Sequence, residues 1–468
     1  MVTIDVLPDD VLLAIFKFYM VGHLHTKPEI EEWQSLVHVC RRWRSIVFGS
    51  PRHLNLRLFC TPETPVRDKL DVWPALPLLI NGDISSAPES SVDNIFVALG
   101  HNNRVREVDL GEIAGPQLEK VLVAMQIPFP EVTHLRFAAS MDDQTLPAVP
   151  DSFLGGSAPC LRYFSLGGIP FPGLSKFLLS ATHLVDLHLH IPQSGYISPE
   201  AMVTCLSTLT SLDKFTLRFQ SLQSHPDGET QHLPMAMFSA LPALSVFQFE
   251  GSSGYLEDLV AHIDAPRLYY FSITFYYQTD FNIPRLLKFI SRTLTLKGPV
   301  EAHAVLERDV AQVKLFSQTS GHGELHVQIP CRRPDLQISS LMHFFASSSY
   351  HLSTVENLYI EDQGSSLPLT SRIEVTLWWE FLRPFVAVKN IYLSETVAFR
   401  IAYTLQALGG GKSLEVLPAL QRIFVRPRKV APPDPSRVGY GQELMGEFVA
   451  ARHLLGHSIT INFSHWSR

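Results

Sequence analysis

The chain has 468 residues, of which 46% are apolar and 18% charged, and its formal net charge is −7 at pH 7. This balance is typical of a globular protein and excludes a disordered chain. The modest acidic excess also argues against a dedicated nucleic-acid binder, which usually carries a basic stripe.

The cysteines and the N-terminal stretch indicate a location. Five widely spaced cysteines form no CxxC pair, which is typical of reduced thiols in an intracellular protein. Asp5, Asp9 and Asp10 stand where a secretory signal would be positively charged. No stretch approaches the roughly 20 apolar residues of a membrane span. We therefore expect a protein of the cytoplasm or nucleus, without a membrane partner.

Two amphipathic helices are predicted near the N-terminus. Pro8 sets φ for a first helical turn, and Asp9 and Asp10 complement the helix dipole there. The apolar positions of this first helix are Val11, Leu12, Ile15, Phe16 and Tyr19. Those of a second helix are Trp33, Leu36, Val37, Cys40, Trp43 and Val47. Such a hairpin is too short to bury both stripes alone, so it must pack on the rest of the chain or on a partner.

The residues of this hairpin resemble the F-box motif. Leu7-Pro8-Asp9-Asp10-Val11-Leu12-Leu13 is followed by Ile15-Phe16, and later by Leu36 and the run Val39-Cys40-Arg41-Arg42-Trp43-Arg44 with Ile46. The resemblance implies binding to a Skp-type adaptor, which links to a cullin scaffold and a RING subunit. The positions that it assigns to adaptor binding are Leu7, Pro8, Leu12, Ile15, Phe16, Leu36, Val39, Cys40, Trp43 and Ile46. From patterning alone, an ordinary capped N-terminal hairpin also explains these residues.

The segment between the two halves departs from the family pattern. The usual F-box has a short connection there, whereas Met20 to Glu32 forms a longer insert with His23, His25 and Pro28. Long loops cost little free energy, so the hairpin tolerates the insert, but its effect on adaptor binding stays open.

A recurring apolar-x-x-apolar-x-apolar triplet fills the body of the chain. The triplets are Val105-Val108-Leu110, Val132-Leu135-Phe137, Leu161-Phe164-Leu166, Leu184-Leu187-Leu189, Leu212-Phe215-Leu217, Leu244-Phe247-Phe249, Leu268-Phe271-Ile273, Val355-Leu358-Ile360, Val388-Ile391-Leu393 and Leu420-Ile423-Val425, with a partial copy at Leu325-Val327. The first seven start 27, 29, 23, 28, 32 and 24 residues apart, which overlaps the period of leucine-rich repeats. Helical segments are expected between them, at 170–181, 201–209, 283–290, 378–385 and 396–408.

Stacked strands of this kind bury alternate residues in one continuous core. The position where typical leucine-rich repeats carry Asn holds Ile113, Ser140, Ile169, Pro192 or Gln220, so the array should be irregular. The predicted fold is therefore α/β, with an N-terminal helical F-box and an irregular leucine-rich-repeat-like solenoid containing a mostly parallel sheet. We expect an F-box-like domain at 1–58, a connecting region with a first strand and helix at 59–100 and the solenoid at 101–426. A Pro-rich loop, a C-terminal helix and a capping strand complete the chain at 427–468.

Strand alternation predicts which side chains line the sheet face opposite the core. A central strip of polar and aromatic residues on this face is the predicted substrate-binding surface: His134, Arg136, Tyr163, His188, His190, Lys214 and Arg218. Later repeats add His326, Asn357, Tyr359, Asn390, Tyr392, Arg422, Phe424 and Arg426 to the same face. Arg and Tyr side chains are common at protein interfaces.

Motifs for catalysis, metal or cofactors are weak. The run 409–413 (GGGKS) lacks the first glycine of a phosphate-binding loop because Gln406 occupies that position. His453 and His457 have zinc-pair spacing, but Leu454 follows where the catalytic Glu of that motif would stand. We expect no metal, no cofactor and no enzyme activity.

The whole chain also resembles F-box proteins that are numerous in mushroom-forming fungi. The residues that carry this include the runs 33–44 and 49–58, the segment 70–77, Leu382-Arg383-Pro384-Phe385 and Phe448 with Ala450-Ala451-Arg452. The resemblance implies a substrate-recognition subunit of an SCF-type ubiquitin ligase that captures an unknown protein. A repeat-protein scaffold without a ligase role is the alternative.

Overall fold

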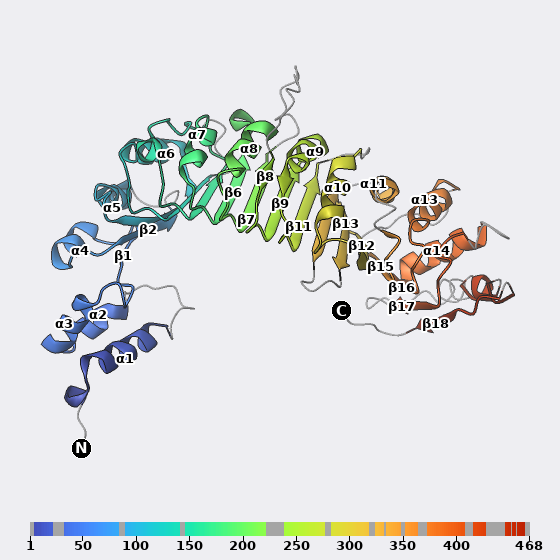
Figure 1. Cartoon of the computed structure of the whole chain (residues 1–468), viewed down its shortest axis with the longest axis horizontal. Helices are drawn as coiled ribbons and strands as arrows, with labels where there is room; N and C mark the ends of the chain where they lie inside the picture. Colours follow the sequence, from blue (N-terminus) through green and yellow to red (C-terminus); the bar gives the residue numbers. More distant parts are fainter. Residues whose placement is uncertain are drawn as a thin grey trace. The chain divides into compact units, whose positions relative to one another are not determined.

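Figure 1 shows a computed structural model of the chain, which describes residues 4–21, 32–83, 89–140, 146–220, 238–276, 282–317, 323–331, 334–347, 352–363, 372–407, 415–426, 445–450, 452–454 and 456–463. The chain divides into two compact units, Met1–Gly195 and Tyr196–Arg468. Among the helices of the described ranges, none has the length and apolar character to cross a membrane.

The first unit begins with helices and continues with strand–helix repeats. Its elements are η1 (Ile4–Val6), α1 (Asp9–Val21), α2 (Glu32–Val37), α3 (Arg41–Gly49), β1 (Leu58–Cys60), α4 (Val66–Val72), β2 (Leu78–Asp83), α5 (Glu89–Leu99), β3 (Val105–Ile113), α6 (Gly115–Ala124), β4 (His134–Ala139), η2 (Phe153–Gly156), β5 (Tyr163–Gly167), α7 (Leu174–Ser180), β6 (Asp186–Ile191) and η3 (Gln193–Gly195).

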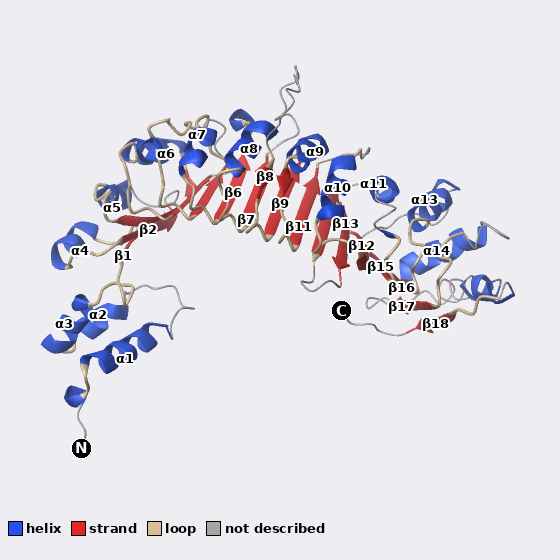
Figure 2. Ribbon diagram, viewed as in Figure 1, coloured by secondary structure: helices blue, strands red, loops and turns tan. Residues whose placement is uncertain are grey.

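The strands of this unit pair in chain order from β1 to β6, and every pair is parallel. Their triplet residues align in register, as Leu135 does with Val108 on one side and Phe164 on the other. All three side chains are buried. Helices α5, α6 and α7 lie on one side of these strands (Figure 2). The predicted inward positions are therefore the core of the unit.

The N-terminal helices differ from prediction in one respect. The prediction of a single second helix from Trp33 through Val47 is wrong, because the chain forms α2 and α3 with a break between them. Cys40 is extended, with φ −158° and ψ 170°, and its Sγ accepts a hydrogen bond from Trp43 N as the N-cap of α3. Arg44 Nε donates to the Val37 carbonyl at 3.0 Å and so satisfies the end of α2. Of the predicted insert from Met20 to Glu32, residues 22–31 lie outside the described residues, whereas Met20 lies in α1 and Glu32 begins α2.

The second unit continues the strand–helix pattern. Its elements are α8 (Pro199–Leu206), β7 (Lys214–Phe219), β8 (Ser239–Ala240), β9 (Val246–Gly251), α9 (Ser253–Ala261), β10 (Ile263–Asp264), β11 (Tyr270–Phe275), α10 (Pro284–Arg292), β12 (Pro299–Leu306), β13 (Val310–Ser317), β14 (Glu324–Pro330), α11 (Pro334–Ser347), β15 (Asn357–Asp362), α13 (Arg372–Leu382), β16 (Asn390–Ser394), α14 (Glu395–Ala407), β17 (Arg422–Arg426) and β18 (Thr460–Phe463).

An antiparallel meander interrupts the parallel sheet of this unit. The strand order is β7-β9-β11-β14-β13-β12-β15-β16-β17-β18, and the pairs β12–β13 and β13–β14 are antiparallel. The chain leaves β11 through α10, enters β12 three places away, and returns through β13 to β14 beside β11. No triplet marks β12 or β13, although Ala311, Val313 and Leu315 alternate inward along β13 as period-two residues.

Aromatic side chains stack through the core of the parallel part. Phe247 on β9 stacks on Phe215 of β7, with ring centroids 5.2 Å apart, and on Phe271 of β11, at 5.0 Å. These are equivalent positions of three successive triplets, and in-register strands about 4.8 Å apart bring such side chains into contact. The inward residues of successive triplets therefore form one continuous core in this part of the sheet.

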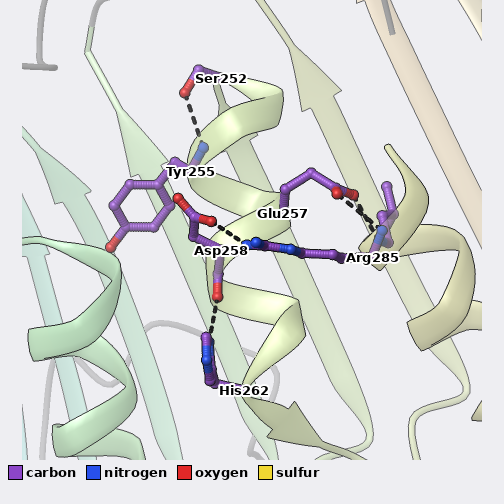
Figure 3. A network of polar contacts seen from close by, with 7 residues as sticks. Ser252, Tyr255, Glu257, Asp258, His262 and Arg285 are labelled. Carbon is purple, nitrogen blue, oxygen red and sulfur yellow. Dashed lines mark hydrogen bonds and ion pairs between the residues drawn. The ribbon is translucent and has the colours of Figure 1, made fainter. Parts of the chain in front are cut away.

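Hydrogen bonds also join neighbouring repeats on the helical side (Figure 3). The buried carboxylate of Glu257 on α9 accepts from the backbone N–H groups of Arg285 at 2.9 Å and Leu286 at 2.7 Å, at the start of α10. Asp258 pairs with the Arg285 guanidinium at 2.5 Å. Ser252 caps α9 by accepting from Tyr255 N. Glu257 supplies acceptors that the first turn of α10 lacks.

The predicted fold class is confirmed: helices at the N-terminus precede strand–helix repeats that build mostly parallel sheet. Helices stand in the five segments where they were expected, as α7, α8, α10, α13 and α14. Residues 445–450 and 452–454 are helical within the predicted C-terminal helix, and β18 follows. The Pro-rich loop and the glycine run at 409–411 lie outside the described residues.

Candidate functional site

The start of α1 is held by a side chain from α3. Arg42 Nη2 donates to the Leu7 carbonyl at 2.6 Å and to Asp9 Oδ1 at 2.6 Å, and its Nε also donates to Asp9 Oδ1, at 3.1 Å. Leu12 N donates to the Pro8 carbonyl at 3.1 Å and closes the first helical turn. The two ends of the motif are therefore joined directly at the Leu7-Pro8 turn.

One apolar stripe of α1 is buried in the chain itself. Leu12 and Phe16 are each 0% exposed. The Phe16 ring packs on Trp43 of α3, with centroids 4.6 Å apart and an interplanar angle of 56°. This contact fixes how α1 and α3 pack, because an offset or tilted pair of rings is the favoured aromatic arrangement.

A second apolar stripe of the same helix is exposed. Val11 is 38% exposed, Ile15 43% and Phe18 84%, and their i, i+4, i+7 spacing places them on one face of α1. Exposed apolar side chains gathered on one helix face are typical of a protein interface. Phe18 is absent from the residues predicted to bind the adaptor, although the spacing from Ile15 was a signal that the sequence contained.

The structure divides the predicted adaptor-binding residues into two groups. Leu12, Phe16, Leu36 and Ile46 are buried in the chain's own core. Pro8, Ile15, Val39 and Cys40 are exposed, and Leu7 and Trp43 are half-buried. The buried members shape the helical unit, and the exposed members are placed where a partner can touch them.

Aromatic contacts join the helices to the connecting region. Trp33 Nε1 donates to the Arg57 carbonyl at 3.0 Å, and its ring meets Trp73 edge-on at 5.0 Å. Phe48 lies against both rings, at 5.9 Å from Trp33 and 6.3 Å from Trp73. Trp33, the first residue of the second expected stripe, therefore packs on the connecting region.

The predicted substrate strip falls on both units. In the first unit, Tyr163 stacks on His134 at 6.0 Å and lies 5.5 Å from His188, across β4, β5 and β6. Arg136 pairs with Asp109 on the neighbouring strand, N to O 3.1 Å. His190 is half-buried at the next outward position of β6. These five residues share one sheet face, as alternation predicted.

The remaining two residues of the strip lie on β7 in the second unit. Lys214 and Arg218 are both exposed. Arg218 Nε lies 3.7 Å from Glu250 Oε2 on β9. The intervening outward residue, Thr216, is 7% exposed. Both arginines of the predicted strip are thus paired with carboxylates of this chain.

An ordered group of polar and aromatic side chains stands farther along the second unit. Four rings stack on β12, β15, β16 and β17: His303, Tyr359, Tyr392 and Phe424. Burial, the Glu301 carboxylate and the neighbouring Tyr392 raise the pKa of the Tyr359 phenol, which therefore stays protonated. Alternation placed three of these rings on the outward face, but the predicted binding residues did not include them.

Metal-binding clusters are absent from the described part of the chain, where no three His, Cys, Asp or Glu side chains gather. His326 on β14 is buried, and burial first and Lys314 second lower its pKa to about 4. Its Nε2 lies 3.3 Å from Gln312 Oε1 and 3.2 Å from Gln328 Nε2, so it belongs to a neutral hydrogen-bond network on the sheet.

One comparison with known proteins matches the N-terminal helices, which carry the exposed apolar stripe of α1. Residues 4–55, which contain α1, α2 and α3, match the family profile described as F-box-like. No curated protein matches the chain. Among solved structures, the chain is similar to the leucine-rich repeat-containing protein LegL7 from Legionella pneumophila, with 12% identity and a TM-score of 0.26 over 84% of this chain and 98% of that one.

Proposed function

We propose that this protein is a non-catalytic substrate-recognition subunit of an SCF-type ubiquitin ligase, which binds a Skp-type adaptor through α1–α3 and a target protein through its repeats. The observation that carries the proposal is the exposed stripe of Val11, Ile15 and Phe18 on helices that match the F-box-like profile. A soluble chain leaves a Phe side chain 84% exposed at a cost in water, and a partner that covers it recovers that cost.

Further exposed apolar residues support the same contact. Val39, between α2 and α3, is 59% exposed, and Tyr19 near the end of α1 is 43% exposed. Tyr side chains are enriched among the few residues that carry most of the binding free energy of protein interfaces. Adaptor binding would then rest on Ile15, Val39 and Phe18 directly, and on Leu12 and Phe16 through the shape that they give to α1.

The proposed ligase role requires that the repeats bind a target protein. A target protein bound to the repeats would be carried beside a ubiquitin-loaded enzyme on a cullin scaffold, and proximity accelerates the transfer. The proposal also includes the predicted domain boundaries at residues 58, 100 and 426. It further includes membership of the F-box family of mushroom-forming fungi and a location in the cytoplasm or nucleus. Reversal of charge at Arg136 and Arg218 together is expected to abolish target capture and to leave adaptor capture unchanged.

Co-purification of the full chain with a recombinant Skp-type adaptor tests the adaptor contact. Ile15→Asp combined with Phe18→Asp should reduce adaptor recovery to background, because two charges replace the apolar stripe. Val123→Asp on α6 is the matched control, since Val123 is 62% exposed on another helix of the same unit. Both variants should melt at the wild-type temperature because they change exposed side chains.

A repeat-protein scaffold without a ligase role is the second candidate. The contacts of Trp33 and Phe48 with Trp73 favour it, because they pack the N-terminal helices on the connecting region of their own chain. Failure of the wild-type chain to recover the adaptor would favour this scaffold over the ligase role. Equal recovery by the double Asp variant would instead reject Ile15 and Phe18 as the adaptor contact.

A further inference from the structure

Two ladders of side chains run across the outward face of β12, β15, β16 and β17. In register, Tyr359 on β15 lies between His303 and Tyr392, and Asn357 lies between Glu301 and Asn390. On β17, Phe424 and Arg422 continue the two rows. The alternate residues of these strands, such as Leu358 and Ile391, are buried on the opposite face.

The aromatic ladder is closely stacked. Ring centroids lie 4.2 Å apart for His303–Tyr359 and for Tyr359–Tyr392, and 4.6 Å apart for Tyr392–Phe424. The last two pairs are almost parallel, at 6° and 7°. Strand spacing imposes this arrangement, and each ring restricts the rotation of the next. The row therefore offers ring edges in fixed positions, which cost little conformational entropy on binding.

The amide ladder orients an arginine. Asn390 Nδ2 donates to Asn357 Oδ1 at 2.7 Å, and Arg422 Nε donates to Asn390 Oδ1 at 2.7 Å. The Arg422 guanidinium also lies over the Phe424 ring, 6.0 Å from its centroid. With Nε held by the amide, the two Nη groups of Arg422 have no hydrogen-bond partner among the described residues and are left for another acceptor. Arg422 is exposed.

The neighbouring carboxylates are already paired. Glu301 lies 2.5 Å from His303 Nε2, and Glu361 lies 3.7 Å from an Nη atom of Arg426. Glu356 pairs with Lys389 at 2.7 Å. Within the described residues Arg422 bonds to an amide and to no carboxylate, unlike Arg426 at the other end of β17. This surface therefore presents an oriented guanidinium whose charge no carboxylate of the described residues balances, beside the edges of aromatic rings.

We propose that this surface binds an acidic peptide segment of the target protein, with an Asp or Glu carboxylate on Arg422 and an apolar side chain of the peptide on the Tyr392–Phe424 edges. The inference rests on the proposed function, since it names the substrate class. A single free guanidinium matches a singly charged carboxylate in a two-bond fork. A phosphoserine carries a charge of about −1.5 to −2 at pH 7, which one guanidinium balances only in part, so the surface favours a carboxylate.

The length of the segment follows from the strand spacing. Lys314 on β13 lies opposite His303, four strands from Phe424. Four steps of about 4.8 Å make roughly 19 Å, which an extended chain covers in about six residues. A second acidic residue about six positions from the first would reach Lys314.

Selection of random eight-residue displayed peptides on the full-length protein tests this inference. The enriched peptides should carry Asp or Glu next to an aromatic or large aliphatic residue. Synthetic copies should bind Arg422→Gln about tenfold or more weakly than wild type, as expected for loss of a charge-assisted contact. Replacement of the acidic residue in the peptide by Asn or Gln should cause a similar loss, and the two losses together should not add.

Arg285→Gln is the matched control, because Arg285 is an exposed arginine on α10 of the same unit, lies outside both predicted binding surfaces and is already paired with Asp258. It should bind the peptides as the wild type does, and thermal melts should show both variants folded. The inference is overturned if no acidic peptides are enriched, if Arg285→Gln rather than Arg422→Gln loses binding, or if phosphoserine in place of the acid binds tenfold more tightly. Peptide binding needs no adaptor, so its failure is separate from failure of adaptor capture by the wild-type chain.

Discussion

Arg42 donates two hydrogen bonds to one oxygen of Asp9, from Nε at 3.1 Å and from Nη2 at 2.6 Å. The two residues stand at opposite ends of the F-box-like segment, and the same guanidinium also binds the Leu7 carbonyl. The contact is exposed, with 37% of the Arg42 and 66% of the Asp9 side chain accessible, so its effect on stability is small. The contact instead holds the Leu7-Pro8 turn in position.

Arg42→Ala is therefore expected to lower the free energy of unfolding by about 1 kcal/mol or less, and to weaken adaptor binding more than that change explains. The physical reason is that the turn loses the donor that holds its carbonyl. Urea denaturation and adaptor titration measure the two effects. Equal losses in stability and binding would show that Arg42 has no orienting role, and Arg41→Ala, at an exposed neighbour, serves as control.

Phe16 and Phe18 are two positions apart on α1 and should respond in opposite ways. Phe16→Ala should lower the free energy of unfolding by about 3–5 kcal/mol, because it removes a fully buried ring that packs on Trp43. Phe18→Ala should change it by about 0.5 kcal/mol or less and weaken adaptor capture. Chemical denaturation of both variants, followed by co-purification of the stable one, checks the pair; similar stabilities would contradict the burial described for α1.

Glu257→Ala should destabilise the second unit by about 2–3 kcal/mol. The substitution leaves the backbone N–H groups of Arg285 and Leu286 without their acceptor at the start of α10. Asp258→Ala is the matched control on the same helix, since its ion pair with Arg285 is partly exposed and contributes about 1 kcal/mol or less. Denaturant titrations measure both. Equal effects of the two substitutions would reject a capping role for Glu257.

His326 predicts a pH dependence of stability. Burial and Lys314 lower its pKa to about 4 in the folded state, whereas the unfolded residue has a pKa near 6.5. The unfolded chain then binds more protons between these values, so stability is fully present above pH 6.5 and falls as the pH is lowered toward 4. At pH 5 the loss is about 2 kcal/mol relative to pH 7.

Urea denaturation of the wild type and of His326→Gln at pH 7 and pH 5 measures this contribution. Gln keeps a polar group beside Gln312 and Gln328 but does not titrate. The wild type should therefore lose about 2 kcal/mol more than the variant between the two pH values. An equal loss in both proteins would show that His326 titrates normally in the folded state.

Local periodicity was sufficient for the repeat body. The inward positions of strands such as β7, β9 and β11 follow from alternation, because a strand turns successive side chains to opposite faces whatever lies around it. Phe215, Phe247 and Phe271 were therefore predicted as core residues, and they are buried. The same alternation placed Arg136 and Arg218 on the outward face, but it said nothing of the carboxylates that pair with them.

Tertiary packing decided the features that depend on distant partners. Both stripes of α1 are apolar at helical spacing, so the sequence could not tell Phe16 from Phe18; the Trp43 ring buries one and leaves the other exposed. The reversed path through β12–β14 depends on long-range strand pairing, which no local pattern encodes. Arg422 and Asn390 are 32 residues apart, and only strand register brings them together. The sequence by itself determined which residues of the repeat strands face the core, and the tertiary structure decided which face of α1 is buried and which outward residues meet.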